Sequence, residues 1–342
     1  MHGGNVYSIA RKNGVDINQI IDFSSNMNDF INIHNFSIAP EYIKNYPEIG
    51  MDSYKRKLAD KEFSENNIFP VPGITYFIHR YLSMINGNII IITPVFTEYL
   101  YILNHGKKIF IPFEAIEKDP DIIQNYNFKA IILVYPDSPR GEMLNINSLL
   151  RLIGLSYKKN AFVILDESFI WFVEQRHLNE KKIIEEYSNV IIARSMTKVF
   201  SMPGLRLGYV ASCPENIDKL EAMQEPWAIS EVALKYLEGI DYKILESVPS
   251  AVAVERKYLI GRMAKLGFSA VGIPEANYAT FHIPDHINGI TLKTYLENHN
   301  LMVRTLEDYP EFGYNYMRIN IKRREKNNIL INEISKFNGG DK

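Results

Sequence analysis

The chain has 342 residues, of which 46% are hydrophobic and 23% charged, and its formal net charge is −2. This balance predicts a globular protein with a large core and gives no reason to expect binding to nucleic acid or to an anionic membrane. The single cysteine, Cys213, excludes an intramolecular disulfide, no apolar run is long enough to span a membrane, and no secretory leader is recognisable, so we expect a cytoplasmic protein.

Six short apolar runs rich in β-branched residues predict strands in the first two thirds of the chain. They are residues 88–94, 107–113, 129–136, 161–167, 189–194 and 207–212. Runs that are apolar on both faces and alternate with helical patterns are typical of a mainly parallel sheet covered by helices. Because α/β proteins bind ligands in the loops after such strands, we expect a site at the carboxyl edge of this sheet.

A second group of elements is predicted after about residue 240: one long amphipathic helix, three short strands and a final helix. They cover residues 246–268, 278–283, 301–306, 316–321 and 325–337 in that order. We therefore predict two domains. The large one comprises residues 46–240, and the small α+β one comprises residues 1–45 and 241–342.

The run over residues 161–167 ends in Asp166 and Glu167, which resembles the magnesium-binding strand of an ATPase. That interpretation requires a G-x-x-x-x-G-K-S/T loop, and the chain has none; the G-x-G-x-x-G of a dinucleotide-binding fold is also absent. Taken alone, Asp166 is equally compatible with capping of the following helix.

Lys198 follows the next predicted strand, within the segment S-M-T-K-V-F-S-M-P-G-L-R-L-G-Y at residues 195–209. Asp166 and Lys198 would both lie at carboxyl ends of strands in one sheet, so their side chains are expected to share a crevice. An amine and a carboxylate facing one ligand suit pyridoxal phosphate, whose aldehyde forms a Schiff base with lysine and whose ring nitrogen is kept protonated by a carboxylate. Ser195 and Arg206 are then candidates for binding the cofactor phosphate.

This segment closely resembles the pattern S-x-S/T-K-x-F/Y-x-x-x-G-L-R-x-G-Y of the fold-type I pyridoxal-phosphate enzymes, the aspartate aminotransferase superfamily. The resemblance implies the α/β fold of these transferases, pyridoxal 5′-phosphate as the cofactor and Lys198 as the catalytic lysine. It also implies that Phe96, in T-P-V-F-T-E-Y, stacks on the cofactor ring, although a core aromatic is the alternative. Backbone N–H groups at the helix start formed by Gly73, Ile74 and Thr75 would hold the cofactor phosphate.

The same resemblance assigns two residues outside these segments. Tyr46, in N-Y-P, corresponds to the tyrosine that crosses a dimer interface to the neighbour's cofactor phosphate, so a homodimer with shared sites is expected. Arg318, in Y-M-R-I-N-I, corresponds to the arginine that binds the substrate α-carboxylate.

Three segments narrow the resemblance to the L-threonine-O-3-phosphate decarboxylases of cobalamin synthesis. They are H-G-G-N at residues 2–5, D-F-S-S-N-M-N at 22–28 and Q-E-P-W-A-I-S at 224–230. The resemblance implies a small phosphorylated amino acid as substrate. His2, Gly3 and Gly4 would form a nest for its phosphate. Asn26 and Arg304 are further candidate substrate contacts.

The chain departs from the superfamily where N-P-x-G is expected, because it has D-S-P-R-G at residues 137–141. Ser138 occupies the place of the asparagine that hydrogen-bonds the cofactor's phenolic oxygen, and serine is shorter. Asp137 is a neighbouring substitute, but a carboxylate beside a phenolate is unfavourable unless it is protonated. Arg140 stands where the family often has threonine, whereas Phe169 agrees with the decarboxylases.

The expected reaction is decarboxylation of L-threonine O-3-phosphate to (R)-1-amino-2-propanol phosphate, with Arg318 orienting the substrate carboxylate. The closest alternative is histidinol-phosphate aminotransferase or a related aminotransferase, which uses the same parts with Lys198 moving the proton. A second alternative is a catalytically weak cofactor-binding or regulatory protein. Ser138 favours it, and the presence of both Lys198 and Asp166 counts against it.

Overall fold

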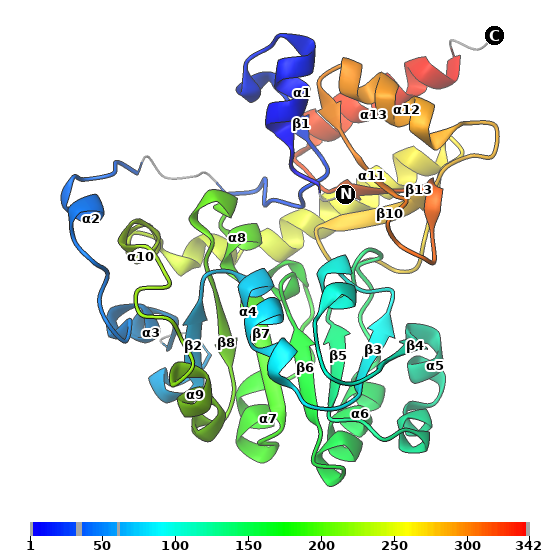
Figure 1. Ribbon diagram of the computed structural model, residues 1–342. Helices are drawn as coiled ribbons and strands as arrows, with labels where there is room; N and C mark the ends of the chain where they lie inside the picture. Colours follow the sequence, from blue (N-terminus) through cyan, green and yellow to red (C-terminus); the bar gives the residue numbers. More distant parts are fainter. Residues whose placement is uncertain (1–2, 32–35, 60–61, 340–342) are drawn as a thin grey trace.

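The computed structural model of the protein describes residues 3–31, 36–59 and 62–339. A seven-stranded sheet forms the centre of the lower part of the molecule (Figure 1). The strands are β2 (Ile68–Val71), β3 (Ile89–Thr93), β4 (Lys108–Pro112), β5 (Ala130–Val134), β6 (Phe162–Asp166), β7 (Val190–Ser195) and β8 (Gly208–Ala211). Their order is β2-β8-β7-β6-β5-β3-β4, and β8 runs antiparallel to β2 and β7 while the other neighbouring pairs are parallel. The expected mainly parallel α/β sheet is confirmed.

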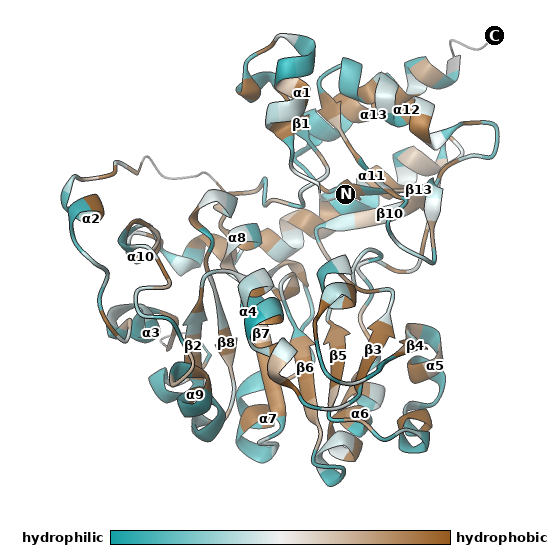
Figure 2. Cartoon of the chain, in the orientation of Figure 1, coloured by the Kyte–Doolittle hydropathy of each residue, from teal (hydrophilic) through white to brown (hydrophobic). Residues whose placement is uncertain are grey.

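Six of these strands lie within two residues of their predicted limits. Figure 2 shows why these strands could be predicted from the sequence: the strands are hydrophobic, and the helices outside them carry hydrophilic outer faces. β2 was not predicted, because its run has only four residues and contains Pro70. It lies at an edge of the sheet, where a residue without an N–H is tolerated.

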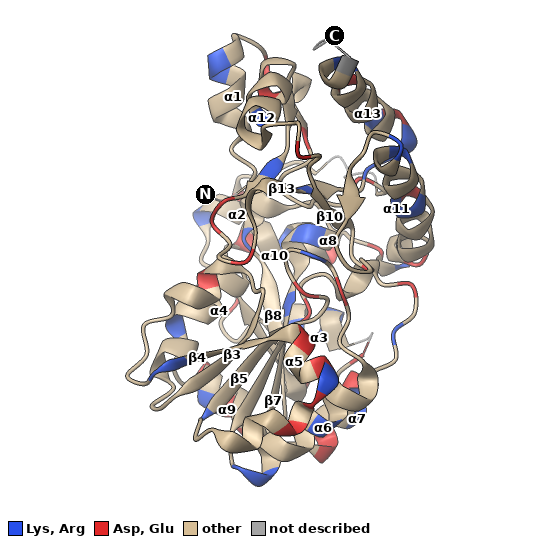
Figure 3. Cartoon of the chain, turned by 90° about the vertical axis from the view of Figure 1, so that its right-hand side faces the viewer, with Lys and Arg blue, Asp and Glu red and all other residues tan. Residues whose placement is uncertain are grey.

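Alternate residues of the central strands pack into two separate cores, one on each face of the sheet, as the period of two in a strand requires. Ile90 and Leu133 belong to one core, and Ile89 and Ile132 to the other. Figure 3 shows the sheet between its two helix layers. The first face is covered by α3 (Asp52–Ala59), α5 (Phe113–Lys118), α6 (Ile146–Lys158), α7 (Glu180–Glu186) and α10 (Glu231–Glu238), and the second by α4 (Ile74–Arg80) and α9 (Pro214–Glu221).

The upper part of the molecule contains a four-stranded antiparallel sheet of order β12-β13-β10-β9 and a separate parallel pair, β1 with β11 (Figure 1). The strands are β1 (Ile21–Asp22), β9 (Ser269–Ala270), β10 (Tyr278–His282), β11 (Leu301–Met302), β12 (Arg304–Leu306) and β13 (Gly313–Asn320). The helices here are α1 (Val6–Asn13), α11 (Val248–Ala264), α12 (Gly289–Asn298) and α13 (Arg324–Gly339). Because β1 pairs with β11, the N-terminal segment lies against the C-terminal part of the chain.

The strand predicted over residues 301–306 is wrong as a single element, because β11 and β12 belong to different sheets. The helix α12 was not predicted, whereas the long helix and the final helix are present as α11 and α13. The division of the chain into domains of residues 46–240, and 1–45 with 241–342, stays a prediction.

Short helical turns complete the described chain. They are α2 (Glu41–Lys44), α8 (Met196–Val199), η1 (Ile17–Gln19), η2 (Glu65–Asn67), η3 (Leu82–Met84), η4 (Thr97–Tyr101), η5 (Pro120–Asn125), η6 (Ile170–Phe172), η7 (Pro203–Leu205) and η8 (Tyr242–Leu245). Within the described residues, no helix combines the length and the apolar character needed to cross a membrane.

Candidate active site

A cavity of about 280 Å³ lies where the carboxyl edge of the large sheet meets the small sheet and the N-terminal segment. Thirteen of the sixteen predicted site residues line it: Gly3, Asn26, Gly73, Ile74, Thr75, Phe96, Ser138, Asp166, Ser195, Lys198, Arg206, Arg304 and Arg318. They come from segments spread from one end of the sequence to the other. The fold therefore adds, to the group of Asp166 and the lysine motif, residues that only the family resemblance had connected with them.

Asp166 ends β6 inside this cavity and is almost completely buried. Its Oδ1 accepts hydrogen bonds from the backbone N–H and the hydroxyl of Ser168, at 2.9 and 2.5 Å. Its Oδ2 accepts one from the Tyr99 hydroxyl at 2.7 Å. Burial raises the pKa of Asp166, and these hydrogen bonds oppose the rise. Neither Ser168 nor Tyr99 was a predicted site residue, and together they fix the direction in which the carboxylate points.

Glu167, the next residue, points to the opposite face of the sheet and belongs to a different network. Its carboxylate pairs with Arg194 at 2.8 Å, and both side chains are fully buried. Burial raises the pKa of Glu167 to about 8, although Arg194 opposes the rise. The alternation of side chains along a strand therefore separates the cavity carboxylate Asp166 from a carboxylate that belongs to the packing of the other face.

Lys198 lies in α8, directly after β7. Its Nζ donates a hydrogen bond to the carbonyl oxygen of Ser25 at 2.8 Å. Burial first, and then the nearby charge of Arg318, lower the pKa of Lys198 to about 7, while Asp22 acts in the opposite direction. A substantial fraction of this amine is therefore neutral at neutral pH, which a nucleophilic amine requires.

The polar groups near Lys198 form a compact anion pocket. Ser195 Oγ and Thr197 Oγ1 lie 2.8 Å apart at the end of β7. Gly73 precedes α4 with φ +85° and ψ 155°, a conformation almost restricted to glycine, and a Cβ atom there would lie 2.8 Å from Arg206 Nη2. Gly73 thus leaves room for the guanidinium. Thr197 was not a predicted site residue, although the S/T position of the lysine motif marks it.

Arg304 and Arg318 lie directly opposite each other on the neighbouring strands β12 and β13, where their Cα atoms are register partners. Both are buried. Arg304 Nη2 pairs with Asp308 at 2.8 Å, whereas its Nε makes no hydrogen bond within the described residues. Burial lowers the pKa of Arg318, and the charge of Arg304 adds to this effect. Two guanidinium groups held this close favour a ligand with more than one anionic group.

Arg318 is oriented by groups from three parts of the chain. Its Nη1 donates to Ser138 Oγ at 3.3 Å, and its Nη2 donates to the carbonyl oxygen of Ser24 at 3.2 Å. The amide oxygen of Asn26, assigned by the donors around it, accepts from Nη2 and Nε at 3.3 Å. The guanidinium lies 5.2 Å from the ring centroid of Tyr278. The fork of Arg318 is therefore preset before any ligand binds.

Asp137 is not among the residues that line the cavity, so it does not take over the role of the asparagine whose place Ser138 occupies. Its Oδ1 accepts from the N–H groups of Gly141 and Glu142, at 2.8 and 3.1 Å, and its Oδ2 accepts from Arg140 Nε at 2.7 Å. Burial raises the pKa of Asp137 to about 6, against the effect of Arg140. Asp137 and Arg140 thus shape the loop, and only Ser138 reaches the cavity.

Three predicted site residues are not among those lining the cavity. His2 lies outside the described residues. Gly4 is beside the cavity, where its N–H donates to Ser24 Oγ at 2.8 Å. Tyr46 is 77% exposed and stacks on Trp227, with ring centroids 4.4 Å apart. Its role toward a partner subunit stays a prediction.

The comparison with known protein families accounts for this arrangement. The description "Aminotransferase class I and II" matches residues 19–334, which is most of the chain. The chain belongs to this family. Its fold is that of the fold-type I transferases, and pyridoxal 5′-phosphate is its cofactor.

Proteins with two kinds of name resemble this chain. "Histidinol-phosphate aminotransferase 2" of Archaeoglobus fulgidus is 27% identical over 328 residues, 92% of each chain. "Adenosylcobalamin biosynthesis bifunctional protein CobDQ" of Leptospira interrogans is 24% identical over 98% of this chain and 40% of its own length.

Two solved structures share the fold of this aminotransferase-family chain. The histidinol-phosphate aminotransferase of Clostridium acetobutylicum matches with a TM-score of 0.81 and 23% identity, over 93% of this chain and 99% of that one. The L-threonine-O-3-phosphate decarboxylase of Porphyromonas gingivalis matches with a TM-score of 0.78 and 21% identity, over 87% and 91%. At these identities the likeness concerns the fold.

The cavity fits the cofactor of the aminotransferase family chemically. A buried carboxylate, an amine that is partly neutral at neutral pH and an anion pocket with a guanidinium are the three groups that a pyridine nitrogen, an aldehyde and a phosphate require. The space that Gly73 leaves beside Arg206 would be filled by any larger side chain.

Proposed function

We propose that the protein decarboxylates L-threonine O-3-phosphate to (R)-1-amino-2-propanol phosphate. The observation that carries the proposal is the pair of buried arginines, Arg304 and Arg318, in register on neighbouring strands of one cavity. Like charges directly opposite in a sheet destabilise it, so the pair calls for anionic partners. A phosphorylated amino acid brings a carboxylate and a phosphate in one molecule, whereas histidinol phosphate brings only a phosphate and an aminotransferase would need the two arginines for the carboxylates of its second substrate, 2-oxoglutarate.

The residues that would hold the cofactor follow from the chemistry of the cavity. Asp166 would pair with the pyridine nitrogen, and Phe96 would cover the ring. Arg206 and Ser195, with the backbone N–H groups at Ile74 and Thr75, would bind the phosphate. Ser138 would face the phenolic oxygen. The bound cofactor supplies an electron sink for the pair of electrons left when a bond to Cα breaks.

The substrate would be oriented by the two arginines. Arg318 is linked to the loop of Ser138 and to Asn26, so it would hold the α-carboxylate close to Lys198. Arg304 would bind the substrate phosphate together with the backbone at Gly3, which lines the same cavity. Held in this way by Arg318, the α-carboxylate is the group whose bond to Cα would break, with the electron pair passing to the electron sink that the cofactor supplies. Lys198, with a pKa of about 7, would return a proton to Cα.

We also propose that the protein is a cytoplasmic homodimer. The exposure of Tyr46 and Trp227 supports an interface at this surface, where the Tyr46 hydroxyl would reach the cofactor phosphate of the other subunit. The relative from Leptospira, whose name refers to adenosylcobalamin biosynthesis, supports a role in cobalamin synthesis. The alternative function is that of a histidinol-phosphate aminotransferase, which the relative from Archaeoglobus supports.

Product analysis of the cofactor-loaded protein with L-threonine O-3-phosphate, in the absence of any keto acid, tests the proposal. We expect carbon dioxide and aminopropanol phosphate in equal amounts. Arg304→Gln is expected to raise KM for the phosphorylated substrate, with the cofactor retained. If neither product forms, and histidinol phosphate with 2-oxoglutarate yields glutamate, the protein is an aminotransferase and the proposal is wrong.

A further inference from the structure

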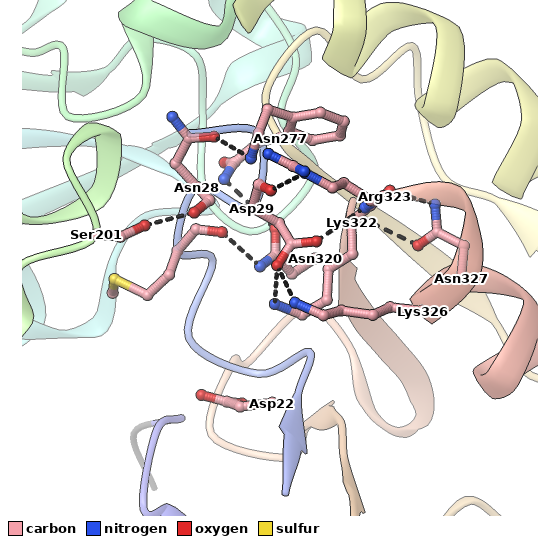
Figure 4. A network of polar contacts seen from close by, with 12 residues as sticks. Asp22, Asn28, Asp29, Ser201, Asn277, Asn320, Lys322, Arg323, Lys326 and Asn327 are labelled. Carbon is pink, nitrogen blue, oxygen red and sulfur yellow. Dashed lines mark hydrogen bonds and ion pairs between the residues drawn. The ribbon is translucent and has the colours of Figure 1, made fainter. Parts of the chain in front are cut away.

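Residues 23–29, which we call the N-terminal strap, run between α8 and the small sheet (Figure 4). The strap passes over the catalytic lysine, since Lys198 Nζ donates to the carbonyl oxygen of Ser25. What the strap does to Lys198 depends on its contacts at the two sides, and these contacts are the same whichever reaction the site performs.

On one side the strap contacts the turn that carries Lys198. The backbone N–H of Asn28 donates to the carbonyl oxygen of Lys198 at 3.0 Å, and its Nδ2 donates to the carbonyl oxygen of Val199 at 2.8 Å. The carbonyl oxygen of Asn28 accepts from the Ser201 hydroxyl, as Figure 4 shows. Asn28 is 5% exposed, and its Oδ1 is occupied by the N–H of Phe30.

These contacts matter because α8 has only four residues. A helix this short is not stable by itself in water, and its last carbonyl groups have no partner inside the helix. Asn28 supplies the partner for that of Val199 and an additional partner for that of Lys198, which also accepts from the N–H groups of Phe200 and Ser201. The position of the lysine backbone is therefore set from outside α8, by a residue about 170 positions earlier in the chain.

On the other side the strap is fastened to β13 and the start of α13. Asn320 donates through its N–H to the carbonyl oxygen of Phe23 and through Nδ2 to that of Met27, both at 2.9 Å. Asp29 is held by Lys322 and Lys326, and by the N–H of Arg323 at 3.0 Å. Figure 4 shows these residues gathered around Asp29.

The strand that holds the strap is also the strand that carries Arg318, two residues before Asn320. The guanidinium of Arg318 and the amine of Lys198 are thus both positioned by β13, although the two residues lie 120 positions apart in the sequence. We propose that Asn28 is a positioning residue for Lys198, which fixes the lysine amine relative to Arg318 by tying α8 to β13.

Two variants of Asn28 test this with the full-length chain. Asn28→Ala removes the donor to Val199, and Asn28→Asp keeps the shape but replaces the donor with an acceptor. The matched control is Asn189→Ala, because Asn189 is also buried and also donates through Nδ2 to a backbone carbonyl, that of Ala161, at 2.8 Å. Asn189 lies directly before β7, at the end of that strand remote from Lys198.

The informative readout is the pH dependence of the rate at which the cofactor-free chain takes up pyridoxal 5′-phosphate, since only the neutral amine reacts. In both Asn28 variants the midpoint should move from about 7 toward the ordinary range of lysine, because a released amine is less buried and farther from Arg318. In the loaded enzymes kcat should fall by about tenfold to a hundredfold with KM little changed. The control should lose stability without moving the midpoint.

Two results would overturn the proposal: Asn28 variants with the wild-type midpoint, or a control that shifts it equally. If Asn28→Ala does not fold, Asn28→Asp and Ser201→Ala give the same information, because each removes one bond between the strap and the turn. If the proposed decarboxylation is wrong and the role of Asn28 is right, the Asn28 variants still shift the midpoint, and the wild-type enzyme forms a different product.

Discussion

A single partly buried amine illustrates how position alone changes the chemistry of a residue. Lys198 would be protonated at neutral pH in an unfolded chain, yet burial and the charge of Arg318 bring its pKa to about 7 in the fold. The folded state therefore resists protonation of this group. Between pH 7 and the ordinary lysine pKa of 10.5 the unfolded chain binds more protons at this position than the folded chain does.

This difference makes Lys198 a source of instability that depends on pH. The cost is full below pH 7, where the amine is protonated in both states, and it disappears as the pH rises through 10.5. We expect Lys198→Met to raise the free energy of unfolding of the cofactor-free protein, with a larger gain at about pH 6 than at about pH 9. Urea unfolding at the two pH values measures it. An equal gain at both would show that the amine titrates normally.

At the scale of elements, the site depends on loops that follow the strands and on the turns that open the next helices. Gly73, before α4, has a backbone conformation in which a side chain costs about 1–3 kcal/mol, and its missing Cβ makes room for Arg206. Gly73→Ala should therefore lower both the stability and the affinity for the cofactor, because the guanidinium must move.

Gly14 provides the matched control for this prediction. It also has a positive φ, of 65°, at the end of α1, but nothing lies within 4 Å of the position of a Cβ atom. Gly14→Ala should cost about 1 kcal/mol of stability and leave cofactor binding unchanged. Equilibrium dialysis of the cofactor against both variants, with thermal unfolding, distinguishes the two effects. Equal affinities would show that Arg206 does not depend on the space at Gly73.

The elements of the large sheet were predictable because their apolar runs are buried on both faces, and the cavity edge followed from the sheet. The lysine motif and Asp166 could be paired from the sequence for the same reason. Tyr99 and Ser168 could not, because their link to Asp166 depends on how η4 folds back onto β6. The split of residues 301–306 into β11 and β12 was equally hidden, since no glycine or proline interrupts the run and only the partners of its two halves differ.

At the scale of the whole molecule, the chain exposes a set of large apolar side chains that its own fold does not cover. Tyr46 and Trp227 stack on each other with 77% and 45% of their surfaces exposed, and Ile49 beside them is 76% exposed. Contiguous exposed apolar groups of this kind mark interaction surfaces. The predicted homodimer would cover them and would place Tyr46 near the other subunit's cofactor phosphate.

Mixing two inactive chains tests whether the sites are shared. A Lys198→Ala chain lacks the amine, and a Tyr46→Ala chain lacks the group predicted to act across the interface. If they form a mixed dimer, one of its two sites combines the intact Lys198 of one chain with the intact Tyr46 of the other. After co-refolding in equal amounts, random pairing should restore about a quarter of the wild-type sites.

The measurement is activity as a function of the ratio of the two chains, with sedimentation velocity to establish the dimer. Activity that never exceeds the average of the separate variants would mean that Tyr46 serves its own chain or no site at all, because a tyrosine acting within its own subunit cannot be complemented by a partner.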